Sequence, residues 1–192
     1  GDRIAYIGPT ASLSRGSAER VVDARGLVVS PGFIDIQSHS WDQLLWRDGR
    51  VVGKVTQGVT TEILGEATTP APIYDGVMSL LDIPDTLPRV IALHHTFRGP
   101  RGFAAWLDAM DRHPNSVNVG SYLGATTVRA YAMGQRQGEP TPAELDTMRA
   151  VVRRAMEDGA LGISSALIYP PGSYATTREL VEMARAMAPF HG

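Results

Sequence analysis

The chain has 192 residues, of which 43% are hydrophobic and 20% are charged. This is the composition of a globular protein with enough apolar material for a sizeable core. Its 18 basic and 20 acidic residues give a net charge of -2 without a cluster of Lys and Arg, which argues against nucleic acid as a partner. No apolar run approaches the roughly 18 residues that cross a bilayer, so we expect no membrane partner. Because the sequence has no cysteine, nitrogen and oxygen atoms must hold any metal that these residues bind.

Short β-branched runs separated by turn residues open the chain. Residues 4–7 end at a Gly-Pro turn, and the runs 21–23 and 27–29 flank the turn at 24–26. This pattern predicts a small antiparallel sheet over residues 1–30. We interpret it as an incomplete β subdomain that lacks its first strand.

After this segment, apolar strands alternate with helical stretches, which is typical of βα units around a parallel sheet. We expect strands at 32–36, 60–64, 117–122 and 160–165. The predicted fold class is therefore α/β, with residues 31–192 forming the first half of a (β/α)8 barrel of the TIM type. A whole barrel needs about 250 residues, so we expect half of it to lie outside this chain.

Two helices have clear start signals. Thr141 and Glu144 have the spacing of a capping box before an apolar stripe at helical period, and Thr176 and Glu179 repeat it. Residues 102–110 form a third predicted helix with its large apolar side chains on one face.

The stretch from 68 to 100 interrupts this alternation. It contains many prolines, a short helical pattern at 74–81 and the pair His94-His95. We interpret it as a long insertion with local structure of its own.

The polar residues after the first strand are candidates for chemistry, because a parallel barrel carries its functional groups at the carboxyl ends of its strands. Period-two alternation predicts that Asp35, Gln37 and His39 point to the same side. A histidine and an amide there can address a metal ion or a carbonyl group. A histidine at a strand end is structural as often as it is a ligand, so the spacing alone leaves both roles open.

Two further candidates follow later strands. Glu66 lies just past the second strand, after Gly65, where its carboxylate can reach the barrel mouth; the alternative is a solvated loop glutamate. Tyr169 lies in the loop after the fourth strand. It can contact a ligand there or serve as a buried aromatic anchor.

Several segments together resemble a known family. Residues 29–35 (VSPGFID) and 58–61 (GVTT) resemble the opening of the amidohydrolase superfamily. Three later segments resemble its D-aminoacylase branch, the N-acyl-D-amino-acid deacylases: 118–124 (NVGSYLG) with Arg129, 158–165 (DGALGISS), and 169–172 (YPPG). The matches follow the family's order over nearly the whole chain except the insertion.

This resemblance implies a metal-dependent (β/α)8 barrel hydrolase that cleaves the amide bond of N-acyl-D-amino acids or related linear amides. It implies one or two zinc ions and a small-molecule N-acyl amino acid substrate. His39 matches the second histidine of the family's strand-one metal motif. Tyr169 matches a tyrosine that contacts substrate, and we assign Arg129 a substrate-binding role as well. Further metal histidines, and the aspartate that acts as general base, are expected beyond this chain.

Three departures from the family pattern affect the predicted site. Gln37 stands where the family has histidine, Ala67 where it has a cysteine ligand, and Ala125 where it has another histidine. A neutral amide is a much poorer zinc ligand than imidazole, so Glu66 is proposed as a substituting oxygen ligand beside Gln37 and His39. These departures favour one alternative, a non-catalytic amidohydrolase-like scaffold.

A second alternative is an amidohydrolase that acts on cyclic amides or dipeptides, because substrate choice lies in loops that this chain mostly lacks. We expect these 192 residues alone to be inactive. We expect a cytoplasmic location, although an export signal would lie upstream of Gly1. The motifs specify no oligomeric state.

Overall fold

The computed structural model describes residues 3–12, 16, 18–74 and 88–192. The chain divides into two compact units, Gly1–Pro31 and Gly32–Gly192. Each unit is described by itself. The short helical pattern predicted at 74–81 falls almost entirely outside the described residues.

The described part of the first unit contains no β-strand, so the antiparallel sheet expected over 1–30 is not seen within these residues and stays a prediction. Its one regular element is the 3-10 helix η1 (Thr10–Ser12), and a turn closes where the Leu27 amide donates to the Ala24 carbonyl. The β-branched runs are exposed, with Val28 at 92% and Val21 at 78%. Runs of three or four residues form at most a two-stranded ribbon, which is marginal in water without further strands or a helix to pack on.

The second unit is built on parallel strands, which confirms the α/β class. Strands β1 (Phe33–Asp35), β2 (Val59–Leu64) and β3 (Asn118–Ser121) form one sheet in that order. Strands β4 (Leu123–Gly124) and β5 (Ile163–Ser164) form a second parallel pair.

The third expected strand, 117–122, corresponds to β3, and Tyr122 separates β3 from the short strand β4. Backbone hydrogen bonds continue across the division, because the Tyr122 amide donates to Leu64 and the Leu161 amide to Ser121, both at 2.9 Å. All four predicted strands are therefore present in parallel succession.

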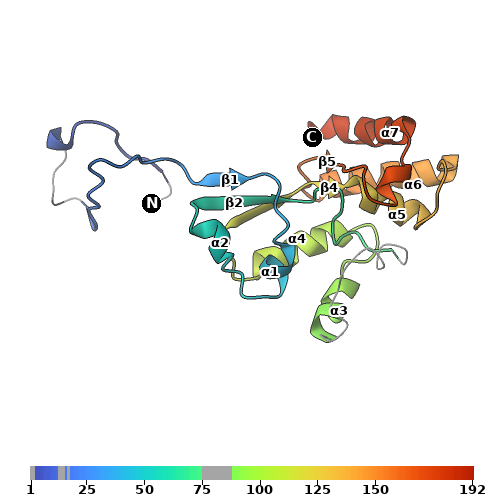
Figure 1. Ribbon diagram of the computed structural model, residues 1–192, viewed down its shortest axis with the longest axis horizontal. Coiled ribbons are helices and arrows are strands. Elements are labelled where there is room, and N and C mark those ends of the chain that lie inside the picture. Colours follow the sequence, from blue (N-terminus) through green and yellow to red (C-terminus); the bar gives the residue numbers. More distant parts are fainter. Residues whose placement is uncertain (1–2, 13–15, 17, 75–87) are drawn as a thin grey trace. The chain divides into compact units, whose positions relative to one another are not determined.

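Helices connect the strands on one side of the sheet, as Figure 1 shows for α1, α2 and α4 below β1 and β2. The helices of the second unit are α1 (Trp41–Leu45), α2 (Val52–Val55), α3 (Pro88–His95), α4 (Gly102–Arg112), α5 (Ala125–Met133), α6 (Pro142–Glu157) and α7 (Thr177–Met187), with the 3-10 turns η3 (Gly172–Tyr174) and η4 (Ala188–Phe190). Helices α5, α6 and α7 gather around β4 and β5 (Figure 1). Among the described residues, no helix is long and apolar enough to cross a membrane.

The predicted helix starts are confirmed, with one difference. At α6 the capping box is complete: the Glu144 amide donates to Thr141 Oγ1, and the Thr141 amide donates to the Glu144 carboxylate. At α7 the Glu179 amide donates to Thr176 Oγ1, but the Glu179 side chain turns instead to Arg129. A buried cation draws that carboxylate away from its own helix end.

The core lies between the sheet and these helices. Phe103 and Trp106 of α4 and Met148 of α6 have no exposed surface. Burial of each such side chain contributes about 1.5–3 kcal/mol.

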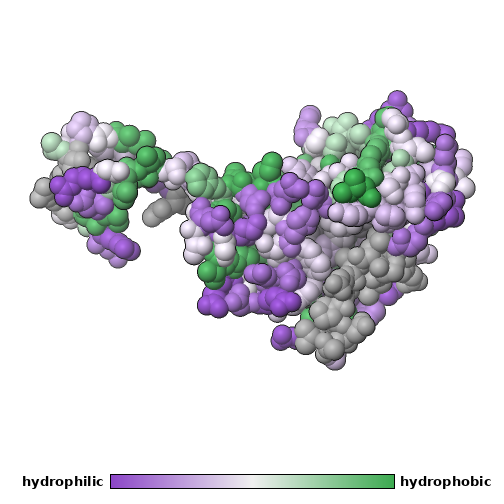
Figure 2. Space-filling model, in the orientation of Figure 1, coloured by the Kyte–Doolittle hydropathy of each residue, from purple (hydrophilic) through white to green (hydrophobic). Residues whose placement is uncertain are grey.

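The opposite face of the sheet is apolar and exposed. Ile34 and Ile36 are 61% and 69% exposed, and Leu161 is 48% exposed. Figure 2 shows apolar surface along the region of β1. A Cβ atom on Gly120 would lie 3.1 Å from both Ile63 and Leu161, so these two side chains share this face.

Candidate metal centre

The segment after β1 does not continue the alternation of the strand. The strand ends at Asp35, and residues 36 and 37 form a bend. Asp35 points to α2, where it pairs with Lys54 and lines a separate cleft, so the prediction that it shares a side with Gln37 and His39 is wrong. The hydrogen bond from Lys54 is the main reason that the pKa of Asp35 lies below its usual value.

Gln37 and His39 do come together with Glu66. The His39 Nε2 atom lies 2.9 Å from the Glu66 Oε2 atom. Hydrogen bonds from Gln37, and secondarily from His39, hold the pKa of the Glu66 carboxyl below its ordinary value. The three residues predicted as metal ligands therefore meet in one place, with Glu66 favoured in its ionised form.

Glu66 owes its position to an unusual turn after β2. Gly65 has φ +97° and Ala67 has φ +58°. A side chain on Gly65 would collide with the carbonyl oxygen of Tyr122, so only glycine fits there. The turn lets the chain leave the strand sharply and present Glu66 toward His39.

Hydrogen bonds to the start of α5 fix this loop. The Thr126 amide donates to the Ala67 carbonyl at 2.9 Å. The Thr69 amide donates to the Thr127 hydroxyl at 2.8 Å, and that hydroxyl donates to the Thr69 carbonyl at 3.0 Å. Thr69 and Thr127 are both buried. The loop that carries Glu66 is therefore held to α5 through both the amide and the carbonyl group of Thr69.

An open cleft of about 530 Å³ contains these three residues. Its lining consists of Gln37, His39, Glu66, Ala67, Thr68, Thr126, Ala166, Ile168, Tyr169 and Pro170. The ring of Tyr169 belongs to this wall and is 65% exposed, so it is available to a ligand rather than buried as an anchor. Its substrate role stays a prediction.

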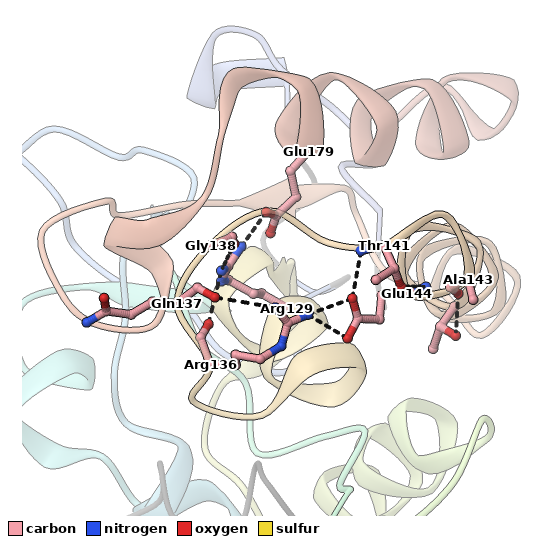
Figure 3. A network of polar contacts seen from close by, with 9 residues as sticks. Arg129, Arg136, Gln137, Gly138, Thr141, Ala143, Glu144 and Glu179 are labelled. Carbon is pink, nitrogen blue, oxygen red and sulfur yellow. Dashed lines mark hydrogen bonds and ion pairs between the residues drawn. The ribbon is translucent and has the colours of Figure 1, made fainter.

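Arg129 lies outside the cleft, contrary to its predicted place in a substrate site. It has no exposed surface and pairs with Glu179, which is equally buried. Its Nη2 atom donates to the carbonyls of Arg136 at 3.1 Å and Gly138 at 2.8 Å, while Arg136 pairs with Glu144 at 2.7 Å. Figure 3 shows the resulting network, which ties α5, α6 and α7 together. Arg129 is therefore a scaffold residue.

Two of the three positions that depart from the family pattern, Ala67 and Ala125, carry apolar side chains. Ala67 lies in the cleft beside Glu66, and Ala125 is buried in an apolar groove between α5 and α7. Within the described ranges, no three His, Cys, Asp or Glu side chains gather as they would around a metal ion. The cleft thus contributes one imidazole, one carboxylate and one amide.

Sequence reasoning missed Thr68 and Thr126 as cleft residues. Thr126 lies next to Gly172, where any side chain would meet its hydroxyl. Its location just after β4 is a signal that was available, because polar residues that follow a parallel strand lie at the mouth of the sheet.

Comparison with known proteins identifies the family to which the chain is similar. The model of the Amidohydrolase family matches residues 20–191. The D-aminoacylase of Alcaligenes xylosoxydans xylosoxydans is 38% identical over 202 residues, which cover all of this chain and 38% of the relative. A solved D-aminoacylase with a binuclear metal centre superimposes with a TM-score of 0.78 at 35% identity, covering 100% of this chain and 38% of that one.

A second solved structure is the N-acyl-D-glutamate deacylase of Bordetella bronchiseptica in complex with zinc and a phosphonate inhibitor. It gives a TM-score of 0.64 at 30% identity over 83% of this chain and 32% of that one. The chain thus spans about two fifths of the length of the relatives it matches. With a family match over most of its residues, the chain belongs to the amidohydrolase family.

Proposed function

We propose that the protein containing this chain is a zinc-dependent hydrolase that cleaves the amide bond of N-acyl-D-amino acids or related linear amides. The observation that carries the proposal is the meeting of His39, Glu66 and Gln37 in one open cleft at the carboxyl end of parallel strands. One solved relative, an N-acyl-D-glutamate deacylase, is complexed with zinc.

The proposed fold of the whole protein is a (β/α)8 barrel, of which residues 31–192 supply the first half. The exposed apolar face with Ile34, Ile36 and Leu161 supports this, because the interior of such a barrel is filled by apolar side chains of its strands. Residues 1–30 then belong to a small β subdomain whose remaining strands come from elsewhere in the protein.

The donor set of the cleft fits part of a metal site. Zinc in hydrolases takes imidazole nitrogen and carboxylate oxygen ligands, and His39 Nε2 and Glu66 Oε2 are 2.9 Å apart at the open cleft. Gln37 is the weakest donor of the three because its amide is neutral. We propose that these residues hold one ion together with ligands from the second half of the barrel.

When bound, zinc would lower the pKa of a water molecule and polarise the acyl carbonyl. The ionised form of Glu66 is favoured before any metal binds, because hydrogen bonds from Gln37 and His39 lower the pKa of its carboxyl group. We propose that Tyr169, which lines the cleft with its apolar neighbour Ile168, binds the substrate. The general base is proposed to lie outside this chain.

A hydrolysis panel on the whole protein tests this function. With added zinc we expect turnover of N-acetyl-D-amino acids, and little turnover of N-acetyl-L-amino acids. We expect His39→Ala and Glu66→Ala to lose most of this activity, and His95→Gln, an exposed histidine outside the cleft, to keep it. Preferred turnover of cyclic imides or dipeptides would overturn the proposed substrate class.

A second candidate function is a non-catalytic scaffold with the amidohydrolase fold. It is favoured by the apolar surroundings of Ala125 and by the presence of only two strong metal ligands among the cleft residues described. Metal analysis of the whole protein, purified without chelators, separates the two. Less than one equivalent of metal together with no turnover would favour the scaffold.

A further inference from the structure

A buried carboxylate contacts the segment that carries two residues of the candidate metal centre. Glu62, in the middle of β2, has no exposed surface. Its Oε2 atom accepts a hydrogen bond from the hydroxyl of Ser38, and its Oε1 atom has no partner among the residues that the structure describes. Leu64, the other buried side chain of this strand on the same face, is apolar. Because burial of a carboxylate costs free energy that an apolar residue avoids, packing alone does not explain Glu62.

The partner of Glu62 is fixed from several directions. Ser38 is 1% exposed, and its amide donates to the Ile63 carbonyl of β2 at 3.0 Å. Its hydroxyl accepts from the Ser40 amide at 3.3 Å and lies 3.2 Å from the Ser40 hydroxyl. Ser38 is therefore anchored to β2 by both its backbone and its side chain.

The residues on either side of Ser38 are the two cleft residues Gln37 and His39. Burial shows how these three side chains divide: Ser38 is buried, whereas Gln37 and His39 are exposed. With the Ser38 side chain held in the core by Glu62, its neighbours are directed outward, and both lie in the cleft with Glu66.

We propose that Glu62 is a positioning residue that acts through Ser38 to place Gln37 and His39 at the cation site. This inference rests on the proposed metal-dependent function. Glu62 would touch neither the metal nor the substrate. It would hold the two ligands in place through Ser38, the residue between them, rather than by a hydrogen bond to either ligand. Changes in outer partners of metal ligands typically weaken metal binding by about 10–100-fold.

A double-mutant set in the whole protein tests this role. The variants are Ser38→Ala, Glu62→Val, the double change, and the conservative Glu62→Gln, whose amide oxygen can still accept from Ser38. Val152→Ala is the control, because it opens the core at a fully buried residue of α6 outside the cleft. Three quantities are measured: zinc affinity by competition with a chromophoric chelator, hydrogen exchange of residues 36–41 by mass spectrometry, and the melting temperature.

We expect Ser38→Ala and Glu62→Val each to weaken zinc binding about tenfold or more and to speed exchange at 36–41. Ser38→Ala should also melt earlier, because it leaves the Glu62 carboxylate without any partner. The double change should recover the melting temperature but not the zinc affinity, since it removes the buried charge and the anchor together. Glu62→Gln should stay within about threefold of the natural protein, and Val152→Ala should lower the melting temperature alone.

Recovery of zinc affinity along with melting temperature in the double variant would overturn the proposal, since the pair would then serve stability alone. Unchanged exchange at 36–41 in Glu62→Val would overturn it as well. If the natural protein itself binds no zinc, the proposed function fails, and the exchange measurement alone then decides whether Glu62 positions this segment.

Discussion

We predict that the folded protein loses stability in acid because of His94, a buried histidine near the end of α3. His94 has no exposed surface, and both of its ring nitrogens lack a hydrogen-bond partner among the residues described. Its ring lies among Trp46 at 5.3 Å, Phe97 at 5.4 Å and Trp41 at 6.2 Å between ring centres. Burial, with a smaller contribution from the charge of His95, lowers the pKa of His94 from 6.5 to about 4.

The sign of the effect follows from these two values. The unfolded chain protonates His94 below pH 6.5, whereas the folded chain does so only near pH 4. The stability that comes from neutral His94 is therefore complete above pH 6.5 and is lost as the pH falls toward 4. The shift corresponds to roughly 3 kcal/mol in all, of which about 2 kcal/mol is lost between pH 7.5 and pH 5.

Replacement by phenylalanine removes this dependence. We expect His94→Phe to gain about 1 kcal/mol at pH 7.5, because two unpaired buried nitrogens disappear, and to gain about 2 kcal/mol more relative to the natural protein at pH 5. Urea unfolding followed by tryptophan fluorescence measures this, since Trp41 and Trp46 contact the ring. Ala92→Ser, an exposed and uncharged change on the same helix, is the control. An equal stability difference between His94→Phe and the natural protein at both pH values would refute the reasoning.

Three further predictions concern the scaffold and the loop of the site. Arg129→Met leaves the Glu179 carboxylate buried and unpaired, so we expect the free energy of unfolding to fall by about 3–5 kcal/mol in urea titration; a loss under 1 kcal/mol would contradict a structural role. Thr141→Ala removes the side-chain cap of α6 and should cost about 1 kcal/mol, and no change in thermal unfolding would show that the cap is dispensable. Gly65→Ala forces a side chain onto a residue at φ +97° and against the Tyr122 carbonyl. It should cost about 1 kcal/mol or more and weaken zinc binding by displacing Glu66, and zinc affinity equal to that of the natural protein would contradict the fixed loop.

The parallel strands and the main helices of the second unit could be predicted because local signals and tertiary packing agree there. Thr141 and Glu144 form the capping box that their spacing indicates, and the apolar stripe behind them is buried. Helix α5 was not foreseen, because it begins directly after β4 at Gly124 with no side-chain cap, and its residues are buried on most sides. Because its buried residues include polar Thr126, Thr127 and Arg129, the helix gives no clear amphipathic period to find.

The candidate site could be predicted in part. Glu66 was found because a glycine precedes it at a strand end, and the structure shows why glycine is required there. Asp35 was misplaced because strand alternation was extended past a bend, and a bend depends on contacts with β2 that the sequence of β1 does not contain. Arg129 was misplaced because a resemblance marks a residue without saying whether it binds a ligand or another side chain.

A crystal structure of the whole protein, with anomalous scattering data collected at the zinc edge, would locate the metal ion directly. We expect a peak about 2.0–2.2 Å from both His39 Nε2 and a Glu66 carboxylate oxygen. A zinc ion bound elsewhere, with these two side chains still paired to each other at 2.9 Å, would contradict this expectation.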